Sequence, residues 1–190
     1  MILQLEIPQI AKQYAWLFLA QNNMGNRGHF DGDRNRQYTG LLGEICFKKL
    51  ITGYWPTLKG GYDGGFDIKL DGLKADVKTM GRKVPVAPDF VHNFVLAQAH
   101  LDAEVLIFQS LIKDTSTLEV CGWISKEDAL AFGTEYPKGT LRRRRDGSTF
   151  ELQAALLEVE QRFLNPFRGH LAFNLESSQL SGPLFAPAQL

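Results

Sequence analysis

The sequence predicts an α/β protein in which a central mixed β-sheet is flanked by helices. Three observations carry this prediction. Apolar residues recur at helical spacing over 8–22 and 39–51. A run in which apolar and charged residues alternate spans 65–79, as expected for a hairpin. Two short apolar runs that are typical of buried strands follow at 104–111 and 118–124, so helices and strands are mixed along one chain.

The first helix is expected over residues 8–22. Pro8 suits a first-turn position. The residues that recur at helical spacing, and should pack inward, are Ile7, Ile10, Ala11, Tyr14, Leu17 and Phe18. A polar loop from 22 to 37 follows. Its segment 31–35 imitates the start of a calcium loop, but Arg36 and Leu42 stand where that loop requires glycine and glutamate, which excludes an EF-hand.

The next helix is expected over 39–51, with Thr39 as its N-cap. Glu44 lies at the margin of its apolar face, next to the small residues Gly40 and Gly43. Two roles are open for Glu44. It can form a surface pair with Lys48, four residues on, worth about 0.3–0.5 kcal/mol. It can also point its carboxylate at the hairpin that follows.

Residues 65–79 predict a β-hairpin closed by Asp71 and Gly72, because Asp-Gly between alternating runs is the strongest short-range hairpin signal. Side chains of a strand alternate between the two faces of a sheet. One face of this hairpin then carries the apolar residues Phe66, Ile68, Leu70, Leu73, Ala75 and Val77. The other face carries the charged residues Asp67, Lys69, Lys74, Asp76 and Lys78.

The expected register places like charges opposite each other. Asp67 faces Asp76 and Lys69 faces Lys74, with Cβ atoms about 5 Å apart, which destabilises a sheet. Paired carboxylates attract a hard cation such as Mg²⁺, and Lys78 reaches the same place from two residues past Asp76. The alternative is an ordinary amphipathic hairpin with an accidental charge pattern and a different turn. In the glycine-rich segment before the hairpin, Asp63 is a weaker candidate ligand.

The order of these residues resembles the PD-(D/E)XK, or restriction-endonuclease-like, nuclease superfamily. In that family a helix with a glutamate precedes a strand with the first aspartate, and an antiparallel strand then carries (D/E)-x-K. Glu44, Asp67 and the triplet Asp76-Val77-Lys78 follow this order within residues 39–79. Phe66 stands where the family name has proline, which many relatives also lack. The resemblance implies a restriction-endonuclease-like core.

The resemblance also implies an activity, metal-dependent hydrolysis of nucleic-acid phosphodiester bonds by a DNA endonuclease. Asp67 and Asp76 would bind Mg²⁺, for which Mn²⁺ can substitute, with the Val77 carbonyl as a further ligand. Lys78 would orient the attacking water and stabilise the negative charge that develops on the phosphorane. Glu44 would hold a second metal or a metal-bound water.

Basic residues outside this motif are candidate nucleic-acid contacts. They are Arg34, Arg36, Arg82, Lys83, Arg142, Arg143, Arg144 and Arg145. Lysine and arginine replace the counterions condensed on phosphates, although solvation of a loop is the commoner role of such charges. The net charge of zero and the pI near 6.9 give the whole molecule no general attraction to polyanions, so binding must rely on a local patch.

The rest of the chain completes the predicted fold. A strand is expected at 90–98, and Ser125 resembles the N-cap of a helix that ends near Phe132. Another helix is expected over 151–164, from the spacing of Leu152, Ala155, Leu156, Val159 and Phe163. Residues 1–175 would form a single domain, and 176–190 an extended or mobile tail.

Cysteine usage and the lack of targeting signals favour an intracellular, cytoplasmic protein. Cys46 and Cys121 are isolated in apolar surroundings, as expected for buried free thiols in a reducing compartment, and no histidine pair shows zinc spacing. The sequence shows neither a signal peptide nor 18 consecutive apolar residues. We therefore expect no membrane partner. A homodimer is compatible with the sequence.

Two other classes of function remain open. A catalytically silent binding module on the same fold would bind DNA with or without Mg²⁺ and would tolerate the loss of Lys78. A structural or interaction protein would bind neither metal nor nucleic acid. The intact set of Glu44, Asp67, Asp76 and Lys78 argues against both, because silent members of such families tend to lose one of the four.

Overall fold

A computed structural model describes residues 2–22, 33–60, 64–144 and 147–167 of the chain. Its largest sheet has, in spatial order, the strands β1 (Leu3–Glu6), β6 (Thr117–Ser125), β5 (Val105–Ile112), β3 (Leu73–Arg82) and β2 (Ile68–Leu70). β3 and β5 run parallel, and the other neighbouring strands are antiparallel. The prediction of an α/β protein with a central mixed sheet is therefore confirmed.

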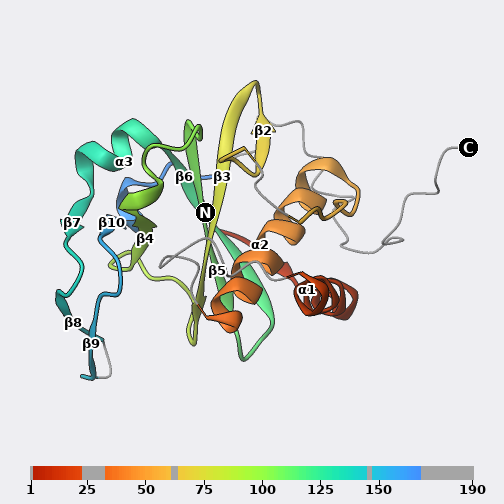
Figure 1. Cartoon of the computed structure of the whole chain (residues 1–190), viewed down its shortest axis with the longest axis horizontal. Coiled ribbons are helices and arrows are strands. Elements are labelled where there is room, and N and C mark those ends of the chain that lie inside the picture. Colours follow the sequence, from red (N-terminus) through yellow and green to blue (C-terminus); the bar gives the residue numbers. More distant parts are fainter. Residues whose placement is uncertain (1, 23–32, 61–63, 145–146, 168–190) are drawn as a thin grey trace, which may run out of the picture.

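Two long helices, α1 (Gln9–Gln21) and α2 (Arg34–Thr52), lie on one face of this sheet (Figure 1). α2 packs on β3, and α1 packs against α2. The α2 side chains at the centre of this core, all at most 2% exposed, are Leu42, Ile45, Cys46 and Phe47. Ala75 and Val77 of β3 belong to the same core, so this part of the hairpin's apolar side faces α2, whereas Leu73 beside the turn is 45% exposed.

A second sheet lies against the other face of the first (Figure 1). It consists of β4 (Val91–Val95), β10 (Leu156–Glu160) and β7 (Thr134–Tyr136), all antiparallel. The helix α3 (Lys126–Phe132) packs on β10 and β6. Helices thus flank the central sheet on both faces, as predicted. The sequence did not indicate that on the face of α3 most of the covering layer is a second sheet.

β5 is the strand shared by the two cores. Its odd-numbered residues Val105, Ile107 and Leu111 pack toward the helices, whereas Leu106 and Phe108 pack toward the second sheet. A β-bulge lies opposite Phe108 and Gln109, where Gly122 of β6 adopts a φ of +146°. A Cβ on Gly122 would lie 2.5 Å from the Asn165 carbonyl oxygen, so a glycine is required where the chain at Asn165 passes close to β6.

The predicted helix over 151–164 is wrong. Residues 149–151 form β9, 156–160 form β10, and only Gln161–Phe163 make a 3₁₀ turn. β10 is the central strand of the second sheet, with Leu157 and Val159 fully buried. A short apolar run at this spacing fits a helix or a buried strand, and pairing with two distant strands decides in favour of the strand.

The predicted start of α2 is also wrong. The helix begins at Arg34 rather than after Thr39, because Asp33 accepts a hydrogen bond from the Arg36 backbone N–H at 2.9 Å and caps it. The Thr39 hydroxyl instead bonds the Asn35 carbonyl one turn back. In α1 the prediction holds for the helix but not for its whole packing face, since Leu17 is 58% exposed.

Other predictions match the structure closely. β5 and β6 occupy the expected strand segments, and β4 occupies the first part of the strand expected at 90–98, whose last residues form the 3₁₀ turn η1 (Leu96–Gln98) instead. Ser125 caps α3 by accepting from the Asp128 N–H at 2.9 Å. Cys46 and Cys121 are buried free thiols. None of the helices in the described ranges has the length and apolar character needed to cross a membrane. Asp63, Arg145 and the predicted tail at 176–190 lie outside the described residues.

Candidate active site

The β2–β3 hairpin has the register predicted from the sequence. Lys69 lies opposite Lys74 and Ile68 opposite Ala75. The turn residues Asp71 and Gly72 have φ values of 48° and 85°, as a type I′ turn requires at both positions. The Lys69–Lys74 repulsion is relieved outside the hairpin, because Lys74 Nζ pairs with Asp102 Oδ2 at 2.9 Å.

Asp67 directly precedes β2 and closes the edge of β3. Its N–H donates to the Ala75 carbonyl at 2.9 Å, and its Oδ2 accepts from the Val77 N–H at 2.7 Å. The N–H and C=O of a strand residue point to the same side of the strand. The Val77 carbonyl therefore points to the edge at which the Asp67 carboxylate lies.

Asp76 and Lys78 project from the face of β3 that is opposite to the α2 core. Lys78 Nζ lies 2.6 Å from Asp76 Oδ2, and the two side chains are only 21% and 10% exposed. The Lys78 ammonium also lies 5.9 Å from the centre of the Phe94 ring of β4. The second sheet thus shields this ion pair from water on one side, which strengthens its electrostatic interaction.

Glu44 comes to the hairpin from α2 because this helix packs very closely on β3. A Cβ built on Gly43 would lie 2.0 Å from Thr79 Oγ1, so only glycine allows the observed approach. The Thr79 hydroxyl donates in turn to the buried Gln109 side chain at 3.2 Å. The residue before Glu44 is therefore fixed against the strand that carries Asp76.

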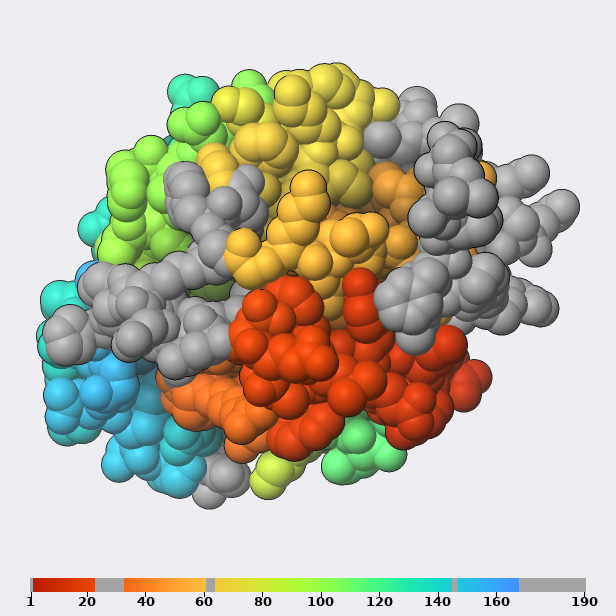
Figure 2. All heavy atoms as spheres, turned by 45° about the vertical axis from the view of Figure 1, so that its right-hand side comes forward, coloured from red at the N-terminus to blue at the C-terminus, as the bar shows by residue number. Residues whose placement is uncertain are grey.

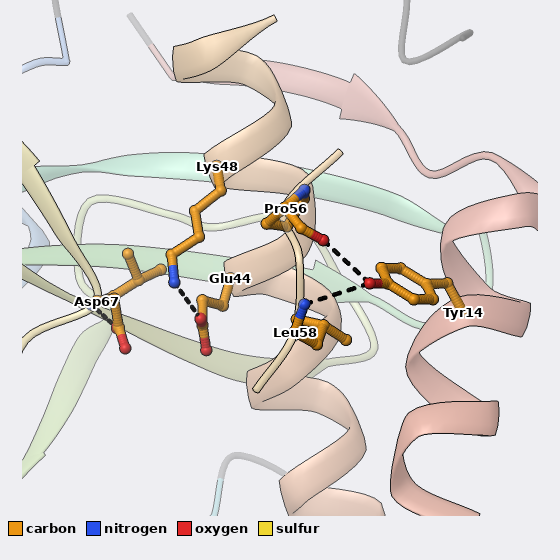
Figure 3. A network of polar contacts seen from close by, with 7 residues as sticks. Tyr14, Glu44, Lys48, Pro56, Leu58 and Asp67 are labelled. Carbon is orange, nitrogen blue, oxygen red and sulfur yellow. Dashed lines mark hydrogen bonds and ion pairs between the residues drawn. The ribbon is translucent and has the colours of Figure 1, made fainter. Parts of the chain in front are cut away.

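Two other carboxylates act electrostatically on Asp67. The pKa of Asp67 is raised well above its ordinary value, first by loss of water around the carboxyl group, then by the negative charges of Glu44 and Asp76. The Val77 N–H and the Lys78 ammonium oppose this shift without cancelling it. Figure 3 shows the Glu44 side chain extending from α2 toward Asp67. The structure thus pairs Lys78 with Asp76 and places Glu44, Asp76 and Lys78 close enough to Asp67 to act on its charge.

Lys48 joins the cluster formed by Glu44, Asp67, Asp76 and Lys78. From the sequence it was expected only as a possible surface partner of Glu44. Its Nζ contacts Glu44 Oε1, and the two side chains are 22% and 21% exposed (Figure 3). Both open roles of Glu44 are therefore realised together: it pairs with Lys48, and it faces Asp67. The signal that could have indicated Lys48 is its i,i+4 spacing from a candidate ligand.

The donor atoms at the site suit a hard divalent cation. Carboxylate oxygens from Asp67 and Asp76 and a backbone carbonyl are ligands that Mg²⁺ accepts, and a cation would offset both the burial of the Asp67 carboxylate and the negative charges of Glu44 and Asp76 beside it. Among the described residues, no three His, Cys, Asp or Glu side chains form a group able to hold an ion by themselves. Mg²⁺ commonly uses one or two carboxylates and completes its shell with water and phosphate oxygens.

The segment that leads into Asp67 is held by α1. The Tyr14 hydroxyl donates to the Pro56 carbonyl at 3.0 Å and accepts from the Leu58 N–H at 3.3 Å (Figure 3). In Figure 2 this segment, coloured orange to gold, lies between α1 in red and the hairpin in yellow. Tyr14 was expected only to pack, and its hydroxyl in addition fixes the loop.

The basic residues near the start of α2 and at the end of β3 differ in how exposed their side chains are and in which groups they bond. Arg34 stacks over Trp16 at 5.1 Å, and Arg36 pairs with Asp33 at 3.5 Å, both at the exposed start of α2. Arg82 is turned inward, donating to Ser110 Oγ at 2.9 Å and to the Val91 carbonyl at 2.6 Å. Its neighbour Lys83 is exposed. Arg82 therefore has a structural duty that the sequence did not indicate.

The arginine block lies in a two-stranded hairpin, β8 (Leu141–Arg143) and β9 (Thr149–Glu151), that extends from the second sheet (Figure 1). Arg142 pairs with the buried Glu158 and lies 3.9 Å from the Tyr136 ring centre. Arg144 packs over Phe150 at 4.2 Å, and Arg143 is exposed. The structure thus separates Arg142, which holds the hairpin to β10, from its solvent-facing neighbours.

Comparison with known proteins returned no matching family model, no matching curated protein and no matching solved structure.

Proposed function

We propose that the protein is a metal-dependent nuclease that hydrolyses phosphodiester bonds, with DNA as the expected substrate, on a restriction-endonuclease-like core. The observation that carries the proposal is the geometry of the β2–β3 hairpin, where the Asp67 carboxylate accepts from the Val77 N–H at 2.7 Å and Lys78 pairs with Asp76 at 2.6 Å. The pKa of Asp67, raised first by burial and then by Glu44 and Asp76, supports it. A fold without a use for this cluster would gain stability by replacing one of the three acids. Perturbed carboxylates of this kind concentrate at functional sites.

Asp67, Asp76 and the Val77 carbonyl would hold a Mg²⁺ ion, and Glu44 would hold a second ion or orient water. Bound Mg²⁺ supplies charge to a phosphate and lowers the pKa of water. The Asp67 carboxylate is already fixed by the Val77 N–H, so it needs little reorganisation to act as a ligand. This edge of β3 is where we expect the scissile phosphate to bind.

Lys78 would stabilise the negative charge that develops on the phosphate during hydrolysis. Its ammonium is held at Asp76 and partly shielded by Phe94, so its charge acts through a medium less polar than water. Preorganised donors of this kind contribute about 10²–10³ in rate. The Lys78 ammonium can also donate a hydrogen bond to the attacking water and orient it.

The test is cleavage of supercoiled plasmid and of oligonucleotides, DNA and RNA, in Mg²⁺, Mn²⁺ or EDTA. We expect metal-dependent cleavage that falls at least about 100-fold in Asp76→Asn and in Lys78→Met. Asp102→Asn is the matched control, because it breaks an exposed aspartate–lysine pair of similar length without touching the cluster.

Cleavage that persists in EDTA, or that survives Asp76→Asn and Lys78→Met, would place the activity elsewhere and overturn the proposal. Binding of DNA without cleavage, unchanged by both substitutions, would instead support a binding module that uses exposed arginines such as Arg36 and Arg143. Equal loss in the Asp102→Asn control would show that the effect is structural.

A further inference from the structure

The Glu44–Lys48 pair is unusual for an i,i+4 pair on a helix. Such pairs are generally exposed and worth about 0.3–0.5 kcal/mol. Here both side chains are about four-fifths buried, at 22% and 21% exposure, and the pair lies beside Asp67 (Figure 3). A lysine that only solubilised the helix would extend into water. Lys48 instead directs its charge into the carboxylate cluster.

Each of the two lysines of the site pairs with a different one of its three acids. Lys78 pairs with Asp76, and Lys48 pairs with Glu44, whereas Asp67 is held by a backbone N–H. With all five side chains ionised the cluster carries one net negative charge. A divalent cation would change it to one net positive charge, which matches the single negative charge of a phosphodiester. Without Lys48 the loaded cluster would be neutral.

We propose that Lys48 is a substrate-binding residue of this site, which holds Glu44 in the metal-free protein and turns to a phosphate oxygen of the nucleic acid once a cation takes its place. This inference rests on the proposed nuclease function. The ammonium of lysine has three donors on a flexible four-carbon stem, so it can exchange a carboxylate for a phosphate without movement of the backbone. Lys48 lies one turn of α2, about 6 Å, beyond Glu44.

The proposal predicts opposite effects on two ligands. In Lys48→Met, Glu44 loses its competing cation, so Mn²⁺ alone, followed by calorimetry, should bind about two- to fivefold more tightly than in the parent. A DNA duplex followed by fluorescence anisotropy in Ca²⁺ should bind about tenfold more weakly, because a charged donor to phosphate is lost. Lys48→Arg should keep both affinities close to those of the parent.

Two variants complete the design. Glu44→Gln releases Lys48 from its partner, so DNA binding in EDTA should strengthen, while Mn²⁺ binding weakens because a ligand is lost. Lys12→Met is the matched control: Lys12 is also partly buried and bonds Ser116 Oγ at 2.7 Å, but it lies on α1 outside the cluster. This control should change neither affinity.

Failure of this inference can be told apart from failure of the nuclease proposal. If the parent cleaves DNA with Mg²⁺ but Lys48→Met binds Mn²⁺ and duplex as the parent does, Lys48 is only a helix-stabilising residue and the inference is overturned. A Lys48→Met protein that is less stable to heat but keeps both affinities would overturn the inference in the same way. If the parent itself neither binds Mn²⁺ nor cleaves, the nuclease proposal fails and takes the inference with it.

Discussion

Gly43 and Gly40 look alike in the sequence, since both are small residues next to Glu44 on a helix. The structure separates them. A Cβ on Gly43 would meet three atoms of Thr79 at 2.0–2.8 Å, whereas a Cβ on Gly40 would meet nothing within 4 Å. The sequence could indicate that the helix approaches something closely near Glu44, but not which glycine makes the contact, because that depends on the strand that packs against it.

Gly43→Ala should destabilise the protein by about 1–3 kcal/mol, because the added methyl group forces α2 away from β3 or Thr79 out of its rotamer. Gly40→Ala is the control in the same helix, and should be neutral or stabilising by up to about 1 kcal/mol, since alanine favours helix. Urea denaturation measures both. Equal effects of the two substitutions would contradict the close contact at Gly43.

Elements held by local signals were predicted well, and those that depend on distant partners were not. The hairpin at Asp71-Gly72 and the cap of α3 at Ser125 follow from residues within a few positions of each other. β10, in contrast, is a strand only because β4 and β7 pair with it. The same limit applies to Arg142, whose partner Glu158 lies 16 residues further on.

Arg142→Ala should lower the free energy of unfolding by about 1–3 kcal/mol, because it leaves the Glu158 carboxylate, which is 9% exposed, without its cation. The partial exposure of Arg142 keeps this loss below that of a fully buried pair. Arg143→Ala, the adjacent exposed position, should change stability by less than about 0.5 kcal/mol. Chemical denaturation of both variants checks this. The idea of a structural Arg142 would be refuted by a stable Arg142→Ala protein that has lost only DNA affinity.

At the scale of the whole molecule, a buried histidine joins the two sheets. His92 of β4 is fully buried, packs on Phe108 of β5 at 5.1 Å between ring centres, and shares a 2.7 Å hydrogen bond with Gln161. Gln161 donates in turn to the Cys121 carbonyl of β6 at 2.9 Å. Burial, and more weakly Arg82, lower the pKa of His92 to about 4, so it stays neutral where a free histidine would be charged.

This shift makes the protein sensitive to acid. An unfolded chain takes up a proton on His92 below about pH 6.5, whereas the folded protein resists until about pH 4, so the free energy of unfolding falls as the pH falls through this window. The loss from this residue should reach about 2 kcal/mol at pH 5. Urea denaturation at pH 7, 6 and 5 measures it. In His92→Gln the free energy of unfolding lost between pH 7 and pH 5 should be smaller by that amount. An unchanged loss would contradict the role given to His92.

The sequence predicted the mixed sheet and the register of its β2–β3 hairpin, because the turn at Asp71 and Gly72 determines that register. It could not predict the second sheet, whose strands β4, β7 and β10 come from three separate parts of the chain. Nor could it assign Arg82 and His92 to the space between the layers, since burial of a polar residue depends on what packs over it.

Asp67 and Asp76 lie close together in the sequence, and this has a consequence for how the protein folds. These residues meet as soon as the hairpin closes, and hairpins form in about 1–10 μs. The parallel β3–β5 pair joins positions 30 residues apart, such as Ala75 and Val105, and has a larger loop-closure cost. In refolding with pulsed hydrogen exchange, the Val77 amide, which donates to Asp67, should therefore be protected before the β5 amides, so Asp67 reaches β3 before the sheet that supports it exists.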